Sequence, residues 1–116
     1  MKIIKWDSKN IYFSDGSFIF CSHFAEGCEH NYADLGVLSD FYHGEEFTKV
    51  FIKAEEEGFF LQLCDSLYFK QSGKTMKIWI PCFSNQNGYY STELTVYYCD
   101  EDGSLLQRIE LDCKEV

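Results

Sequence analysis

Apolar and polar residues alternate along most of the chain with the two-residue period that is typical of β-strands. In the segment 75–83 every second residue is apolar, namely Met76, Ile78, Ile80 and Cys82. The same period recurs and predicts further strands over 2–6, 11–13, 17–24, 47–54, 59–64, 89–99 and 104–113. We therefore expect a mainly β protein of about seven strands.

Short polar segments separate these strands and indicate antiparallel hairpins. Asp15-Gly16 and Asn87-Gly88 are turn signals between apolar runs. Pro81 cannot donate a ladder hydrogen bond, so its strand should lie on an edge or contain a bulge there. The strand 17–24 is apolar on both faces, which predicts a central strand that is covered on each side.

The stretch 21–41 interrupts this alternation. Asp34 can cap a short helix, and Leu35, Leu38 and Phe41 have the spacing of one apolar helical stripe. The expected fold is mainly β (α+β), with one domain over residues 1–116. A curled antiparallel sheet, half-barrel or small sandwich of about seven strands would carry one short helix near 34–43.

Composition and charge restrict the classes of function that the protein can have. Hydrophobic residues make up 46% of the chain, which is enough to bury a core and excludes disorder. Ten basic residues against 19 acidic ones give a net charge of −9. Such a charge repels phosphates and anionic lipid, so we expect no direct nucleic-acid contact and no membrane contact.

The N-terminal segment and the cysteines indicate the cellular compartment of the protein. Residues 1–10 are too short and too charged for a signal peptide, and no apolar run approaches the ~20 residues of a membrane span. We therefore expect a cytoplasmic protein. The six cysteines contain no CxxC pair, which in a reducing compartment predicts free thiols.

Two motifs resemble a known family. The string Cys28–Asp34 is similar to the "CCE…NYAD" signature of a family of small uncharacterised bacterial and phage proteins, and Asn85–Ser91 is similar to its "NGYYS" segment. The order and separation of the motifs also match, over most of the chain from the second strand onward. Gly27 stands where the family often has the first cysteine of a pair. The family is a domain of unknown function, so the resemblance implies no activity or cofactor.

Four side chains within ten residues are of the types that zinc prefers: Cys21, His23, Cys28 and His30. On a strand the first two point the same way, and the other two would return from the loop. Their spacing is not that of a zinc finger or ribbon, so the competing interpretation is core cysteines and ordinarily hydrogen-bonded histidines. Zinc is accordingly a minor hypothesis.

Cys28 with His23 or His30 could also form a thiolate–imidazole pair for nucleophilic catalysis. Neighbouring carboxylates, Glu29 and Asp34 among them, would raise the pKa of this thiol rather than lower it. The sequence therefore favours a protein that is not an enzyme.

Polar and aromatic residues gather in two loops, as in many recognition surfaces. The candidate binding residues are His30, Asn31, Tyr32, Asp34, Asn85, Asn87, Tyr89 and Tyr90. The main hypothesis is a non-enzymatic cytosolic module that binds another protein. One alternative is a phage-derived inhibitor whose acidic side chains, including 55–57, occupy the nucleic-acid-binding site of a host protein. The other is the zinc- or thiol-dependent site around residues 21–30.

Overall fold

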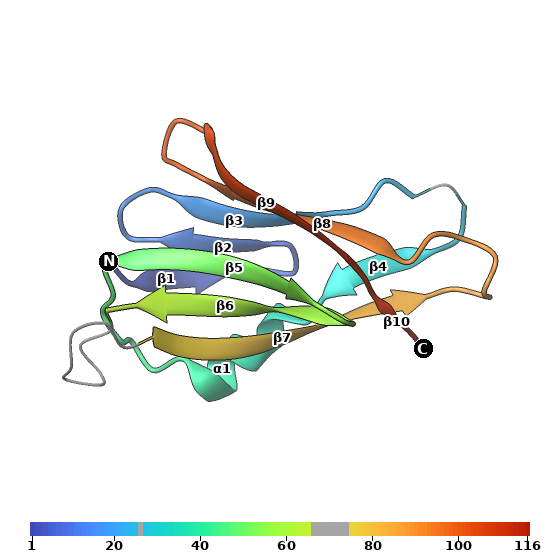
Figure 1. The fold of residues 1–116 in the computed structure, drawn as a ribbon, viewed down its shortest axis with the longest axis horizontal. Coiled ribbons are helices and arrows are strands. Elements are labelled where there is room, and N and C mark those ends of the chain that lie inside the picture. Colours follow the sequence, from blue (N-terminus) through green and yellow to red (C-terminus); the bar gives the residue numbers. More distant parts are fainter. Residues whose placement is uncertain (26, 66–74) are drawn as a thin grey trace.

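Two β-sheets pack face to face in the computed structural model, which describes residues 1–25, 27–65 and 75–116 (Figure 1). The first sheet is antiparallel and its strands follow the order β1 (Ile3–Trp6), β2 (Asn10–Phe13), β3 (Phe18–Ser22), β8 (Glu93–Cys99) and β9 (Leu105–Asp112). The second contains β4 (His30–Ala33), β5 (Lys49–Glu55), β6 (Gly58–Cys64), β7 (Thr75–Asn85) and β10 (Lys114–Glu115). The mainly β fold class is confirmed.

The apolar face of each sheet forms one core between the two layers. On β3 the buried side chains are Ile19 and Cys21, while Phe18 and Phe20 on the outer face are only half-buried. The strand is central, as expected, but the prediction that both of its faces are covered is wrong. Phe20 instead stacks on Tyr97 of the neighbouring strand, with 6.1 Å between ring centroids.

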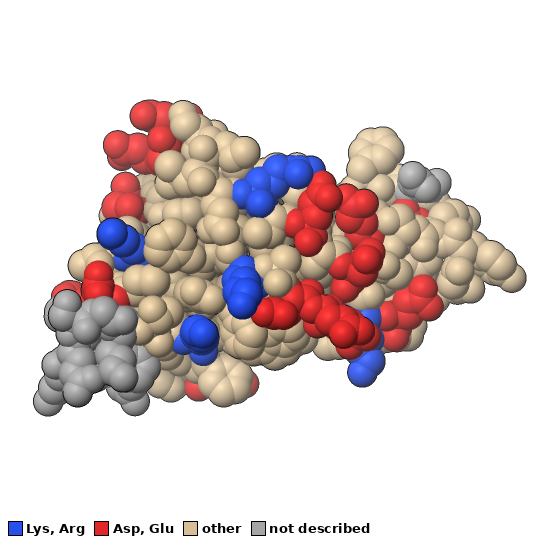
Figure 2. All heavy atoms as spheres, viewed as in Figure 1, with Lys and Arg blue, Asp and Glu red and all other residues tan. Residues whose placement is uncertain are grey.

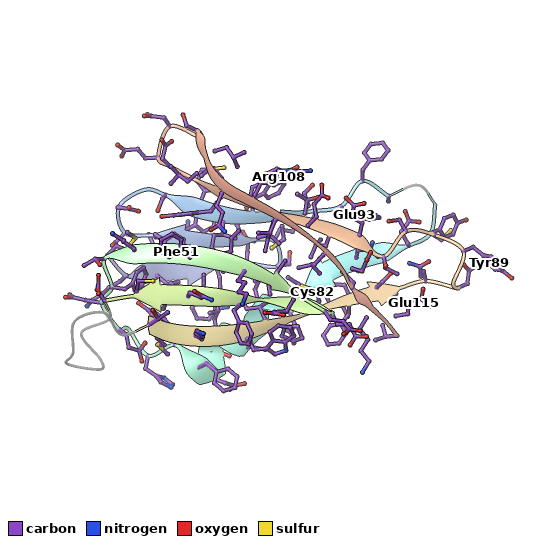
Figure 3. The ribbon with its side chains drawn as sticks, in the orientation of Figure 1. Phe51, Cys82, Tyr89, Glu93, Arg108 and Glu115 are labelled. Carbon is purple, nitrogen blue, oxygen red and sulfur yellow. The ribbon has the colours of Figure 1, made fainter. Side chains whose placement is uncertain are left out.

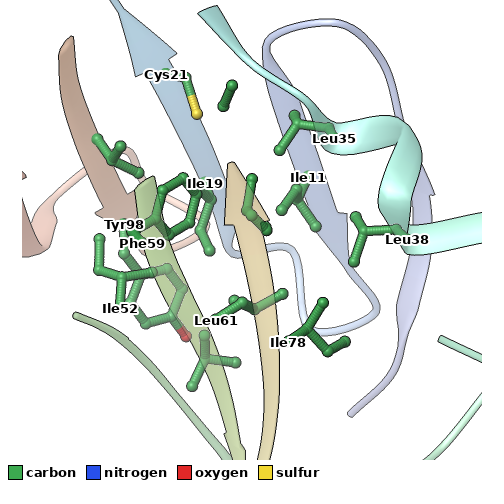
Figure 4. Close-up of a cluster of buried hydrophobic side chains, with 14 of the residues drawn as sticks. Ile11, Ile19, Cys21, Leu35, Leu38, Ile52, Phe59, Leu61, Ile78 and Tyr98 are labelled. Atoms are coloured by element: carbon green, nitrogen blue, oxygen red, sulfur yellow. The ribbon is translucent and has the colours of Figure 1, made fainter. Parts of the chain in front are cut away.

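A short helical segment closes one side of the core. It consists of the 3₁₀ helix η1 (Leu35–Val37) followed by α1 (Leu38–Phe41). Leu35 and Leu38 are almost completely buried, and Figure 4 shows both pointing from this segment toward Ile11. The predicted helix at 34–43 is present, but the Asp34 side chain makes no capping hydrogen bond, so that part of the prediction is wrong.

The sequence missed two strands and misplaced the start of a third. β4, with the sequence HNYA, shows no alternation of apolar residues, and β10 has only two residues. β8 begins at Glu93 rather than at residue 89. The ambiguous segment 65–70 and the turn at 71–74 fall almost entirely outside the described residues.

Pro81 lies where β7 changes partners. β6 pairs with residues 75–81 along one edge of β7, and β4 pairs with residues 82–85 along the other. The last hydrogen bond on the β4 side runs from the Asp34 N–H to the Pro81 carbonyl, at 2.9 Å. Since Pro81 has no N–H to return, the ladder ends there, in agreement with the expected edge position.

One side chain joins the two sheets at the outer edge of β5. The Gln107 amide accepts a hydrogen bond from the Ile52 N–H at 2.9 Å and donates one to the Ile52 carbonyl. It therefore reproduces the hydrogen bonds of a neighbouring strand residue and covers an edge that would otherwise be open.

We predict that Gln107→Ala lowers the free energy of unfolding by about 1–3 kcal/mol, because both backbone groups of Ile52 lose a partner. Urea denaturation followed by circular dichroism measures this loss. The control is Leu106→Ala, whose side chain is 55% exposed and which should change stability by no more than about 0.5 kcal/mol. Equal stability of the two variants would contradict the role of the Gln107 amide.

Candidate functional site

Two connections meet at one end of the molecule and form what we call the loop tip. They are residues 23–25 and 27–29, between β3 and β4, and residues 86–92, between β7 and β8. Figure 1 places both at the same end of the sandwich, and Tyr89 projects from that end in Figure 3. The loop tip thus brings together the two segments that the sequence singled out, because β4 pairs with β7 in the register His30↔Asn85.

A buried amide holds the second connection to β4. Asn31 is 7% exposed, and its Nδ2 donates to the carbonyls of Ser91 and Glu93, both at 2.9 Å. Its Oδ1 accepts a hydrogen bond from the Ser84 hydroxyl, which is fully buried. All three bonds satisfy groups that burial would otherwise leave unpaired, so Asn31 fixes the path of the chain as it enters β8.

Gln86 completes this network inside the connection. Its Nε2 donates to the Ser84 hydroxyl and the Ser91 carbonyl, and its Oε1 accepts the Tyr90 N–H at 2.8 Å. Side-chain bonds therefore replace strand pairing between residues 86 and 91, which explains the late start of β8.

The two connections also contact each other directly. A Cβ atom on Gly27 would lie 2.4 Å from ring carbons of Tyr90, so a larger residue at position 27 would require this ring to move. Phe24 and Ser91 border a common hollow of about 290 Å³. The loop tip is therefore one continuous surface rather than two separate loops.

Two aromatic side chains stand out from the loop tip. Phe24 is 88% exposed and Tyr89 is 84% exposed, the highest values among the large hydrophobic residues of the described chain. Exposed rings on a rigid backbone are unfavourable in water and are common anchors of protein interfaces. Phe24 was not predicted as a binding residue, because the sequence pattern places it at the end of a strand.

The structure distributes the eight predicted binding residues unevenly. Asn31 is buried and acts as a support, whereas Tyr32, Asp34 and Tyr90 are half-buried. The exposed members are His30, Asn85, Asn87 and Tyr89. Tyr32 stacks on His30 with 4.9 Å between ring centroids, which places both rings on the outer face of β4.

A groove of about 500 Å³ runs beside β4, between this strand and the end of β3. Within it the His23 Nε2 lies 3.2 Å from the Glu29 Oε1, in a pair that is almost fully enclosed: the side chains are 10% and 0% exposed. A carboxylate only accepts hydrogen bonds, so with Glu29 ionised Nε2 carries a proton. No sequence pattern predicts this pair, because the two residues are six positions apart in a stretch without a regular period.

The four predicted zinc ligands do not converge. Cys21 is buried, Cys28 is exposed and His23 is paired with Glu29. In the described parts of the chain no group of three or more His, Cys, Asp or Glu side chains is arranged to hold a metal ion. The zinc hypothesis stays an untested prediction, without support from this arrangement.

All six cysteines lie within the described residues and carry free thiols. Three of them are buried near one another: Cys21, Cys82 and Cys113. Burial, together with the neighbouring Cys113, raises the pKa of Cys21 to about 12. A side-chain hydrogen bond with Cys113 and burial also raise the pKa of Cys82. The thiols of Cys21 and Cys82 therefore stay protonated at neutral pH and are poor nucleophiles.

Acidic side chains gather on the part of the surface around the ends of β9 and β10 and the β5–β6 turn (Figure 2). Cross-strand pairing brings Glu93 opposite Asp112, and Glu115 lies nearby at the chain end (Figure 3).

Of the helices within the described residues, none has the length and apolar character needed to cross a membrane.

We predict that Asn31→Ala lowers the free energy of unfolding by about 2–4 kcal/mol, since three side-chain hydrogen bonds are lost in a buried position. Amide hydrogen exchange should also show faster exchange at Tyr90, whose position depends on this network. The control is Asn87→Ala on the exposed surface of the loop tip, with a change of at most about 0.5 kcal/mol. Unchanged exchange at Tyr90 in Asn31→Ala would contradict the anchoring role.

We also predict that a thiol reagent at pH 8 labels Cys28 rapidly in the folded protein. Cys21, Cys82 and Cys113 should react only after unfolding, because burial excludes the reagent and the raised pKa values of Cys21 and Cys82 suppress the thiolate. Mass spectrometry of peptides from timed reactions identifies each site, and Cys28→Ser should remove the fast phase. Fast labelling of Cys82 in the folded state would show that the core opens readily.

Comparison with known proteins adds no identification. No protein-family model, no curated protein and no solved structure matches the chain. The resemblance to the bacterial and phage family stays a prediction that rests on its two motifs.

Proposed function

We propose that this protein is a non-enzymatic module of the cytoplasm that binds another protein through the loop tip. The single observation that carries the proposal is the exposure of Phe24 and Tyr89 on two adjacent connections. Large rings buried at the centre of an interface account for much of its binding free energy.

The support beneath these rings strengthens the proposal. The hydrogen bonds of Asn31 and Gln86 hold the second connection, and the Gly27–Tyr90 contact holds the two connections together. A surface that is already ordered loses little conformational entropy on binding, so more of the contact energy appears as affinity.

The test is capture of a partner from a bacterial lysate with tagged protein, followed by measurement of the affinity of the purified partner. We expect the double variant Phe24→Ala/Tyr89→Ala to weaken binding by at least about 30-fold, which is about 2 kcal/mol. Phe51→Ala is the control, because Phe51 is 49% exposed and lies at the opposite end of the molecule (Figure 3). A partner that binds the double variant as tightly as the unchanged protein would contradict the proposal.

The acidic surface supports a second candidate, inhibition of a host protein that normally binds nucleic acid. The observation in its favour is the gathering of carboxylates around Glu93 and Asp112, close to the β5–β6 turn. Binding through this surface would weaken steeply with salt and would be lost in the triple variant of residues 55–57 to Lys. The loop-tip variant would leave it intact, so the same captured partner distinguishes the two candidates.

A further inference from the structure

β4 has one edge that no described strand covers. The Asp34 N–H donates to the Pro81 carbonyl, and hydrogen-bonded pairs alternate along an antiparallel ladder. Tyr32 and His30 therefore exchange hydrogen bonds with β7, and the N–H and C=O groups of Asn31 and Ala33 point toward the opposite edge. In residues 1–25, 27–65 and 75–116 no strand pairs along that edge.

This edge opens into the groove of about 500 Å³. The end of β3 and the first connection of the loop tip form the facing wall, and the turn at residues 7–9 closes one end. An unpaired strand edge on an open surface invites aggregation. Here the edge is recessed, so a partner reaches it only as a narrow, extended chain.

The His23–Glu29 pair adds a hydrogen-bonding group on the same groove. The His23 side chain is nine-tenths buried, and no described residue bonds its Nδ1. With Nε2 donating to the carboxylate, Nδ1 accepts an incoming N–H in the neutral imidazole and donates to an incoming C=O in the imidazolium. The groove thus offers donors and acceptors on β4 and one further hydrogen-bonding group on the facing wall.

The charges that line the groove are mostly negative. The carboxyl groups are those of Asp7, Glu29 and Asp34, against the single ammonium group of Lys9. The backbone N–H of Lys9 donates to Asp7 and holds the pKa of that carboxyl below its usual range, so Asp7 stays ionised. A segment with Lys or Arg side chains complements this lining, and an acidic segment does not.

We propose that the groove binds an extended, basic peptide segment of a partner protein, which adds to β4 as a further strand. Main-chain hydrogen bonds to Asn31 and Ala33 would provide the pairing, and the carboxylates would select the charge of the segment. The proposal goes beyond the proposed function, since it assigns a second binding surface to the protein. This surface does not include Phe24 or Tyr89, so each proposal can fail alone.

The test uses a displayed library of random twelve-residue peptides selected on the immobilised full-length protein. We expect an enriched family that carries Lys or Arg and that binds Asp34→Lys at least tenfold more weakly than the unchanged protein. Asp34 makes no capping hydrogen bond, so this variant should fold. The control is Asp102→Lys, the same change of charge in the exposed β8–β9 turn at the other end of the molecule (Figure 1).

Hydrogen exchange measured by NMR supplies the readout that is specific for strand addition. With an enriched peptide bound, the amides of Asn31 and Ala33 should exchange more slowly, while that of Tyr32, already bonded to β7, should not change. The absence of any enriched family, equal binding to the Asp34→Lys and Asp102→Lys variants, or protection confined to other residues would each overturn the proposal.

The loop-tip variant separates this proposal from the proposed function. Phe24→Ala/Tyr89→Ala should retain the enriched peptides while it loses the captured partner. Loss of the peptides in this variant would assign them to the loop tip and overturn the groove as their site. Retention of both the peptides and the partner would leave the groove proposal standing and contradict the loop tip.

Discussion

The hydrogen bonds of one buried amide, that of Asn31, determine how this end of the protein is built. A strand of four residues has little apolar surface of its own, and β4 is held by its pairing with β7 and by this side chain. Asn31 satisfies two carbonyls at the entrance to β8 and accepts the hydroxyl of Ser84. Both the loop tip and the groove beside β4 depend on where this strand lies.

The alternation of apolar residues predicted most strands because each of them buries one face in the common core. β4 could not be predicted in the same way, since its position is set by pairing with residues far along the chain: Asn31 and Ser84 are 53 residues apart. Residues 89–92 also continue the strand pattern, but the side chain of Gln86, four residues before Tyr90, bonds the Tyr90 N–H and keeps this backbone in a loop. The local pattern determines which face of a strand is buried, whereas side-chain hydrogen bonds determine where these strands begin.

The candidate site, like the fold, was predicted from the sequence only in part. The sequence located both segments of the loop tip from their polar and aromatic residues, and it named Tyr89. It did not identify Phe24 as exposed, because an apolar residue at the end of a strand usually faces the core. It also treated His23 as a zinc ligand, whereas the fold places this imidazole against Glu29 inside a groove that no sequence pattern reveals.

The residues that hold the loop tip in place differ from the aromatic residues exposed on it, and this difference has a consequence for how the protein can evolve. The groups that hold the loop tip in place are the buried Asn31 and Ser84, the half-buried Gln86 and the contact of Gly27 with the Tyr90 ring. The side chains at positions 24 and 89 take no part in that support. Under the proposed function, substitutions there would alter what is recognised while the architecture persists, and related chains would diverge in specificity long before they diverge in fold.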